Sequence, residues 1–113
     1  RSVRKVPVPD HVMDFVLDVV RVTRPTEPDA PAFVKELISW GAGPRASQAL
    51  ILAAKTHAAL AGRMNVACDD VRHVALPVLR HRLLASFTAE AEGITTDSIV
   101  QRLLQEVRER ATS

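Results

Sequence analysis

The stretch GAGPRASQALILAAKTHAALAGR, residues Gly41–Arg63, carries the strongest helix signal in the chain. Pro44 suits the first position of a helix, because its missing N–H would have no partner there. Apolar and small side chains then recur on one face at helical spacing; they are Ala46, Ala49, Leu50, Ala53, His57 and Leu60. So many alanines imply the close approach of a neighbouring helix. The stretch predicts a helix from Pro44 to about Ala61, closed by Gly62.

Helical patterns also lie on both sides of this stretch. Before it, valines recur at helical spacing between Asp10 and Thr23, which predicts a first helix there. After it, a helix is expected to start near Cys68 and to end or kink at Pro77, because proline lacks an N–H and crowds the preceding turn. A last helix is predicted from Thr96 to about Arg110, with Thr95 as its N-cap.

One segment stays ambiguous between helix and strand. Residues 33–40, FVKELISW, follow a proline-rich loop, and their apolar residues fit either period. A short helix is favoured because Lys35 and Glu36 interrupt any alternation. The whole pattern predicts an all-α fold, a small bundle of four to five helices forming a single domain over residues 1–113.

The composition supports a packed helical domain. Of the 113 residues 47% are hydrophobic but only 4% are aromatic, so the core must be aliphatic, which suits helices better than a β-sandwich. The net charge is only +2 with acids and bases interspersed, which favours a solvated mixed surface over a nucleic-acid-binding face. No apolar run approaches the roughly 18 residues of a membrane span. The lone Cys68 cannot form an internal disulfide, so we expect a reducing compartment, the cytoplasm.

Arg45 is unusual, because the backbone dipole disfavours a positive charge in the first turn of a helix. An anion would reverse that balance, since free N–H groups and a guanidinium fork could then meet one phosphate. Gly41 and Gly43 would also let a ligand approach the backbone closely. The alternative is that Arg45 pairs with a nearby carboxylate, and the local pattern leaves both possibilities open.

These motifs resemble a known family. GAGPRASQALILAAKTHAALAGR is similar to the second-sensor helix of the MoxR-type AAA+ ATPases, related to the magnesium chelatase ATPase subunit clade, whose usual form is Gly-Ala-Ser-Pro-Arg-Ala. VACDDVRHVALPVLRHRL and FTAEAEGITTDSIVQRLL continue the resemblance in the family's order, from Val3 to Val107 in all. Gly43 stands where serine is usual. Ala67 and Cys68 replace the common Thr-Pro, so the helix there depends on its following acids.

The resemblance implies the C-terminal helical lid of a longer AAA+ ATPase whose P-loop core lies upstream, and the chain, which starts at Arg1, looks like a piece of such a protein. Arg45 would be the second-sensor arginine that reads the γ-phosphate of ATP, within a nucleotide-binding stretch of Gly43, Pro44, Arg45 and Ala46. The full-length protein would use ATP and Mg²⁺. This fragment has no Walker motifs, so we expect it neither to bind these cofactors nor to hydrolyse ATP by itself.

The same resemblance implies partners. They are the upstream core and neighbouring subunits of a ring, usually a hexamer, and a protein with a von Willebrand factor A domain. The family acts as chaperones that mature, or insert metals into, enzyme complexes. A different hypothesis is a histone-fold-like module for nucleic-acid binding or dimerisation, which rests on a long helix, a short connector and a DDV helix start.

Other side chains are given structural interpretations. His57, His73 and His81 with Cys68 fit no zinc spacing, so no metal site is predicted. Cys68 is expected to be an inert thiol. Arg82 is expected to form a salt bridge with an acid such as Glu90 or Glu92, although the Arg80–Arg82 run could instead reach a phosphate or a neighbouring subunit.

The one tryptophan, Trp40, is expected to anchor the preceding loop on the bundle, with contact to a partner as the alternative.

Overall fold

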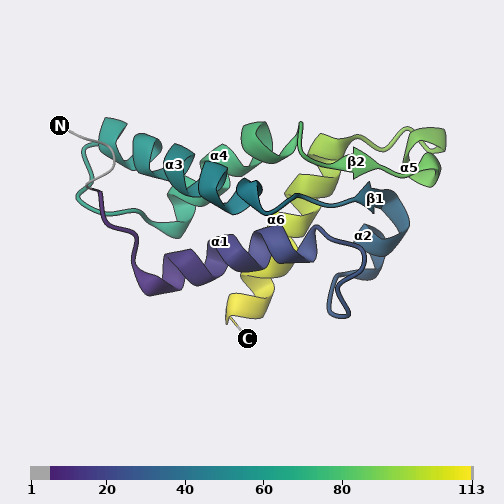
Figure 1. The fold of residues 1–113 in the computed structure, drawn as a ribbon, viewed down its shortest axis with the longest axis horizontal. Coiled ribbons are helices and arrows are strands. Elements are labelled where there is room, and N and C mark those ends of the chain that lie inside the picture. Colours follow the sequence, from purple (N-terminus) through teal and green to yellow (C-terminus); the bar gives the residue numbers. More distant parts are fainter. Residues whose placement is uncertain (1–5, 113) are drawn as a thin grey trace.

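The computed structural model describes the backbone of residues 6–112 and the side chains of residues 6–107. Within this range the chain forms six helices and one pair of short antiparallel strands (Figure 1). In chain order the elements are α1 (Asp10–Val22), α2 (Ala32–Leu37), β1 (Ile38–Trp40), α3 (Arg45–Leu60), α4 (Cys68–Leu79), β2 (Leu84–Ala85), α5 (Phe87–Ala91) and α6 (Thr96–Thr112). The predicted all-α class is confirmed, and the short α5 accounts for the helix beyond the expected four or five.

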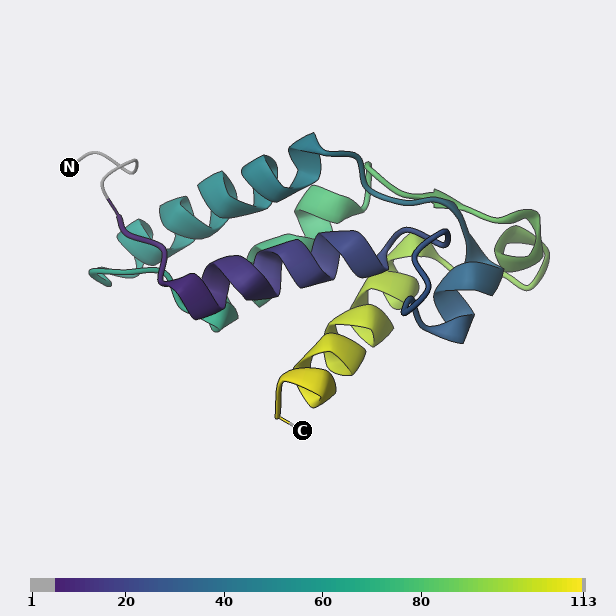
Figure 2. The same ribbon diagram turned by 60° about the horizontal axis from the view of Figure 1, so that its bottom comes forward.

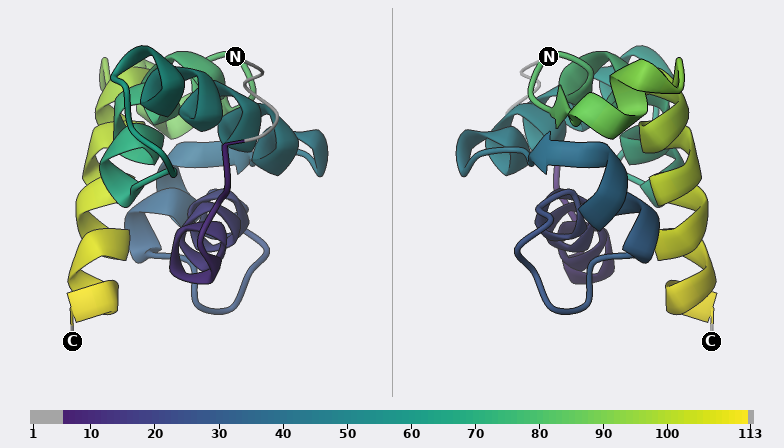
Figure 3. Two further views of the ribbon diagram at one scale, coloured as in Figure 1. Left: turned by 90° about the vertical axis from the view of Figure 1, so that its left-hand side faces the viewer. Right: turned by 90° about the vertical axis from the view of Figure 1, so that its right-hand side faces the viewer.

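The molecule is elongated, with principal extents of 46 × 28 × 20 Å. α1 and α3 run along its length, while α2, β1, β2 and α5 gather at one end (Figures 1 and 2). α6 packs against both α1 and α4, and a view down the long axis shows it along one side (Figure 3). One continuous core joins the helices, and it is aliphatic except for Phe15 and Phe33. No helix among the described residues has both the length and the apolar character to span a membrane.

The buried face of α3 differs from the predicted stripe. Its buried residues are spaced four apart, at Ala46, Leu50, Ala54 and Ala58, and they face mainly α4 and α1. Leu60, predicted to lie on the stripe, is 85% exposed because it stands in the last turn, beyond the packed region. Three of the four buried residues are alanines, whose small side chains let the neighbouring helices pack closely.

Two predicted helix boundaries are confirmed by their hydrogen bonds. Gly62 has φ of 77°, and beyond it the Arg63 N–H donates to the Ala58 carbonyl at 2.9 Å, which is the bonding of a Schellman C-terminus. At the start of α6, the Ser98 N–H donates to Thr95 Oγ1 at 3.2 Å, so Thr95 is the N-cap.

The prediction that α4 ends at Pro77 is wrong, because α4 continues through Pro77 to Leu79; the alternative, a kink at Pro77, stays a prediction. Val71, Ala75 and Leu79 are fully buried at a spacing of four, and their packing outweighs the hydrogen bond that proline cannot donate. The ambiguous segment is a helix that turns into a strand: α2 ends at Leu37, and β1 then pairs with β2 through Ile38 opposite Ala85.

Candidate functional site

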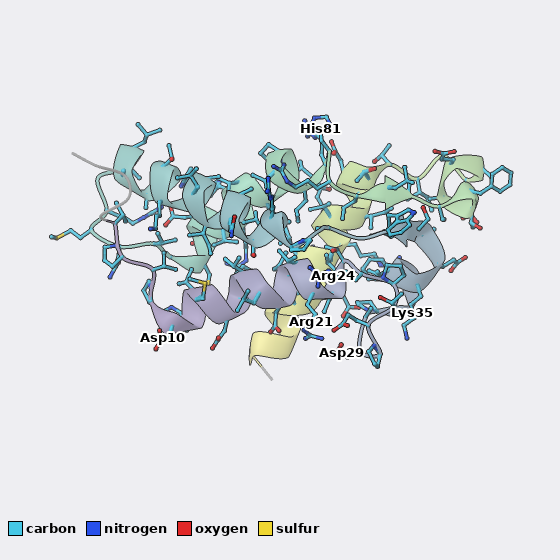
Figure 4. All side chains as sticks on the ribbon, viewed as in Figure 1. Asp10, Arg21, Arg24, Asp29, Lys35 and His81 are labelled. Atoms are coloured by element: carbon cyan, nitrogen blue, oxygen red, sulfur yellow. The ribbon has the colours of Figure 1, made fainter. Side chains whose placement is uncertain are left out.

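The loop that leads into α3 is held by the end of α1. Thr23 is fully buried; its Oγ1 donates to the Val20 carbonyl at 2.6 Å and accepts the Ala42 N–H at 3.0 Å. Arg24, seen at the end of α1 in Figure 4, donates from Nε to the Ala42 carbonyl at 2.9 Å. Both backbone polar groups of Ala42 are therefore bonded to the end of α1, which sets the position at which α3 begins.

The two glycines of this loop have different surroundings. A Cβ on Gly41 would lie 2.6 Å from Arg24 Cα and 2.7 Å from the Thr23 carbonyl oxygen, so Gly41 allows the loop to approach the end of α1 closely. A Cβ on Gly43 would meet nothing within 4 Å. Gly41 also lines the pocket beside Trp40, and Gly43 borders open space, so the expectation that both glycines make room for a ligand stays a prediction.

Arg45 stands at the start of α3 without a charged partner. Pro44 already has helical dihedral angles, φ −60° and ψ −27°, and no side chain caps the helix. Arg45 is exposed, and no hydrogen bond or ion pair joins its side chain to any residue that the structure describes. Pairing with a nearby carboxylate, the alternative left open by the sequence, does not occur within this range. The guanidinium therefore adds its charge to the positive end of the α3 dipole.

The predicted nucleotide-binding residues line one pocket. Gly43, Pro44, Arg45 and Ala46 surround a space of about 450 Å³, and Arg82 completes its lining. The Ala46 N–H already donates to the Gly43 carbonyl at 3.0 Å, so this amide is not free to bind an anion. An anion in the pocket would therefore be bound mainly by the guanidinium groups. A second pocket of about 470 Å³ shares Gly43 and is lined on its other sides by Arg24, Trp40 and their neighbours.

The place of Arg82 was not predicted correctly. It forms no salt bridge with Glu90 or Glu92; its Nη1 donates to the Val78 carbonyl at 2.9 Å instead. The ion pair of this segment belongs to Arg80, whose Nε and Nη2 bind the two carboxylate oxygens of Asp97 at 3.0 and 2.9 Å. The turn after α4 brings Arg82 back toward the start of α3, and spacing along the chain does not reveal this.

Trp40 does not anchor the loop on the bundle, because 72% of its side chain is exposed. It is the last residue of β1, opposite Leu84 of β2, which is itself exposed. The short sheet holds the backbone in place and leaves the indole on the surface, where it lines the second pocket beside Gly43. The alternative expectation, contact with a partner, remains a prediction.

A buried carboxylate joins α3 to α4 away from the pocket. Asp70 is fully buried and accepts the Ala67 N–H at 2.8 Å, so it caps the start of α4 as the sequence implied. It also binds His57 Nδ1 at 2.6 Å and the Arg63 guanidinium. Burial by itself would raise the pKa of Asp70, but these hydrogen bonds outweigh it and hold the pKa below its ordinary value.

Cys68 and the histidines form no reactive centre in the part of the chain that the structure describes. Burial raises the pKa of the half-buried Cys68 thiol, which disfavours the reactive thiolate, and the inert thiol stays a prediction. The rings of His57 and His73 stack with their centroids 4.8 Å apart. Among the described residues, no three histidine, cysteine or acidic side chains are grouped so that they could hold a metal ion. His81 lies in the turn that follows α4 (Figure 4).

The chain is similar to known proteins over most of its length. The AAA lid domain family matches residues 30–103. Chaperone MoxR1 of Mycobacterium tuberculosis is 40% identical over 85% of this chain and 26% of its own length. The uncharacterized protein YeaC of Bacillus subtilis is 31% identical over 96% of this chain and 31% of its own.

A solved structure of an ATPase-like protein is also similar to this chain. The crystal structure of a "putative ATPase" from Cytophaga hutchinsonii superposes with a TM-score of 0.84 at 32% identity, over 91% of this chain and 31% of that one. The chain thus spans about a quarter to a third of the length of the relatives it matches. These matches favour a lid over a histone-fold-like module. The chain belongs to the AAA lid domain family, with the MoxR-type ATPases as its relatives.

Proposed function

We propose that residues 1–113 are the C-terminal lid of a longer AAA+ ATPase, in which Arg45 contacts the γ-phosphate of ATP bound to the upstream core. The observation that carries the proposal is the exposed guanidinium of Arg45, which has no partner among the described residues and lines a pocket at the start of a long helix. A phosphate in that pocket would gain charge-assisted hydrogen bonds and the favourable end of the helix dipole.

The attachment of the pocket to α1 explains how phosphate contact could move the whole lid. The backbone at Ala42, three residues before Arg45, is bonded to Thr23 and Arg24 at the end of α1. A displacement of Arg45 would therefore move α3 and α1 together, because these hydrogen bonds couple the two helices. ATP, with its terminal phosphate, would hold the lid against the core, and ADP would release it. This is how Arg45 couples the nucleotide state to lid position.

The relatives also suggest a biological role and partners for the full-length protein. The similarity to a MoxR chaperone supports a chaperone-like role. We further propose that this role is to mature partner complexes, including metal insertion into them, within a cytoplasmic protein. The neighbouring subunits of a ring, as a hexamer, and a protein with a von Willebrand factor A domain are the proposed partners. Hydrolysis of Mg²⁺-bound ATP is assigned to the upstream core, because this chain has no G-x-x-x-x-G-K-[ST] motif.

The test replaces Arg45 by glutamine in the full-length protein. We expect R45Q to weaken binding of a non-hydrolysable ATP analogue by roughly tenfold or more, since hydrogen bonds to charged groups contribute about 1.5–3 kcal/mol. ADP affinity should stay the same, because ADP has no γ-phosphate. Equilibrium titration with both nucleotides measures the difference, and ATP turnover should fall with it.

Arg102→Gln is the matched control, because it removes the same charge from an exposed position on α6 where the guanidinium only stacks over Phe33. R102Q should leave both nucleotide affinities unchanged. The role of Arg45 would be refuted if R45Q and R102Q bound both nucleotides alike and hydrolysed ATP at the same rate.

A further inference from the structure

The pocket at the start of α3 contains a second arginine that the proposed function does not use. Arg45 and Arg82 are far apart in the sequence, yet both line the same space of about 450 Å³. Both side chains are exposed, and neither has a carboxylate partner among the described residues. Two like charges facing one pocket without an acid between them repel each other, and a bound anion would relieve that repulsion.

The neighbouring Arg80 shows that this segment can neutralise an arginine. Its guanidinium is held by both carboxylate oxygens of Asp97, at 3.0 and 2.9 Å, and that pair fastens the end of α4 to the first turn of α6. Arg82 has no such acid. Its contact with the Val78 carbonyl uses Nη1 alone, so Nε and Nη2 make no hydrogen bond with the described residues. That contact also holds the side chain at the end of α4, which reduces the conformational freedom it would lose on binding.

We propose that Arg82 is a second phosphate-binding residue, and that it and Arg45 bind the same terminal phosphate of a nucleoside triphosphate. The proposal rests on the proposed function of Arg45. Two guanidinium groups match the charge of a terminal phosphate better than one, and they come from two different elements, the start of α3 and the turn after α4. A triphosphate would therefore hold these two elements at a fixed distance, whereas a diphosphate would bind neither arginine.

The experiment measures nucleotide binding to the full-length protein carrying Arg82→Gln. R82Q should weaken a non-hydrolysable ATP analogue by about tenfold, the scale of one charge-assisted hydrogen bond, and should leave ADP affinity unchanged. Arg80→Gln is the matched control, two residues away and equal in charge change, and it should leave both affinities unchanged. The melting temperature of each variant checks that the fold is intact.

The double variant R45Q/R82Q tests whether the two residues share one phosphate. Side chains that bind the same group are coupled, so the double variant should lose less affinity than the product of the two single losses. The inference is overturned if R82Q binds the ATP analogue like the unchanged protein, if it weakens ADP equally, or if the two losses multiply. In those cases a selective loss in R45Q still supports the role of Arg45, and the absence of any loss in R45Q removes both proposals.

Discussion

Replacing Gly41 by alanine should destabilise the domain far more than the same change at Gly43. A Cβ at Gly41 would lie 2.6 Å from Arg24 Cα, and the nearest ordinary contact is 3.4 Å, so the loop or the end of α1 must move by about 0.8 Å. The two nearest obstructing atoms belong to the backbone and cannot rotate away. Both hydrogen bonds that hold Ala42 would lengthen with this movement.

Overpacking of this kind costs about 1–3 kcal/mol, and each weakened hydrogen bond adds up to about 1 kcal/mol. We therefore expect Gly41→Ala to lower the free energy of unfolding by roughly 2–4 kcal/mol. Gly43→Ala adds its methyl group to open space, and we expect a change of about 1 kcal/mol or less there.

Urea unfolding of the 113-residue chain, followed by far-ultraviolet circular dichroism, measures both variants on the same scale. The explanation of Gly41 by its contact with α1 would be refuted if the two alanine variants had equal stability. In the full-length protein Gly41→Ala should also weaken the discrimination between ATP and ADP, because α3 would no longer begin at the same place.

Two further changes test other parts of the structure. Asp70→Asn should lower the free energy of unfolding at neutral pH by about 1–3 kcal/mol, because it removes the buried negative charge and turns one of the two acceptor oxygens into an NH2 donor, which leaves a facing donor without its acceptor. Since the folded-state pKa of Asp70 is lowered, the contribution of its ionised form is complete above the unfolded-state value of about 3.9 and is lost as the pH falls through the folded-state pKa. In urea titrations from neutral to acidic pH, the free energy of unfolding should therefore fall more in the unchanged chain than in D70N. Equal falls in the two chains would contradict this. Trp40→Ala should change the free energy of unfolding by no more than about 0.5 kcal/mol, because the indole is 72% exposed, and a large loss in the same assay would show that Trp40 packs on the bundle after all.

The long helices were predictable because each carries its own apolar face. α1, α3 and α6 have repeating patterns and recognisable ends, such as Thr95 and Gly62, and these signals depend only on residues a few positions apart. The strands were not predictable, because each has two or three residues and Ile38 finds its partner Ala85 far along the chain. Pro77 misled for a similar reason: its effect on α4 was decided by the packing of Leu79, which the local sequence does not show.

Part of the candidate site could likewise be predicted from the sequence, and part of it could not. The proline and arginine at the start of α3 mark an unusual helix terminus, and Arg45 could be singled out from them. Arg82 could not be placed, because its position depends on how the chain turns after α4. Gly41 and Gly43 look equivalent in the sequence, and only the distance to α1 shows that Gly41 packs against the end of that helix while Gly43 does not.

The exposure of Trp40 gives the domain a natural optical reporter. It is the one tryptophan of this chain, and its indole lies in water beside the loop that leads to Arg45. Indole emission shifts to shorter wavelength when water around the ring is replaced by protein. Anything that covers the second pocket would therefore change the fluorescence of the chain, while events at the far end of α3 would leave the spectrum as it is.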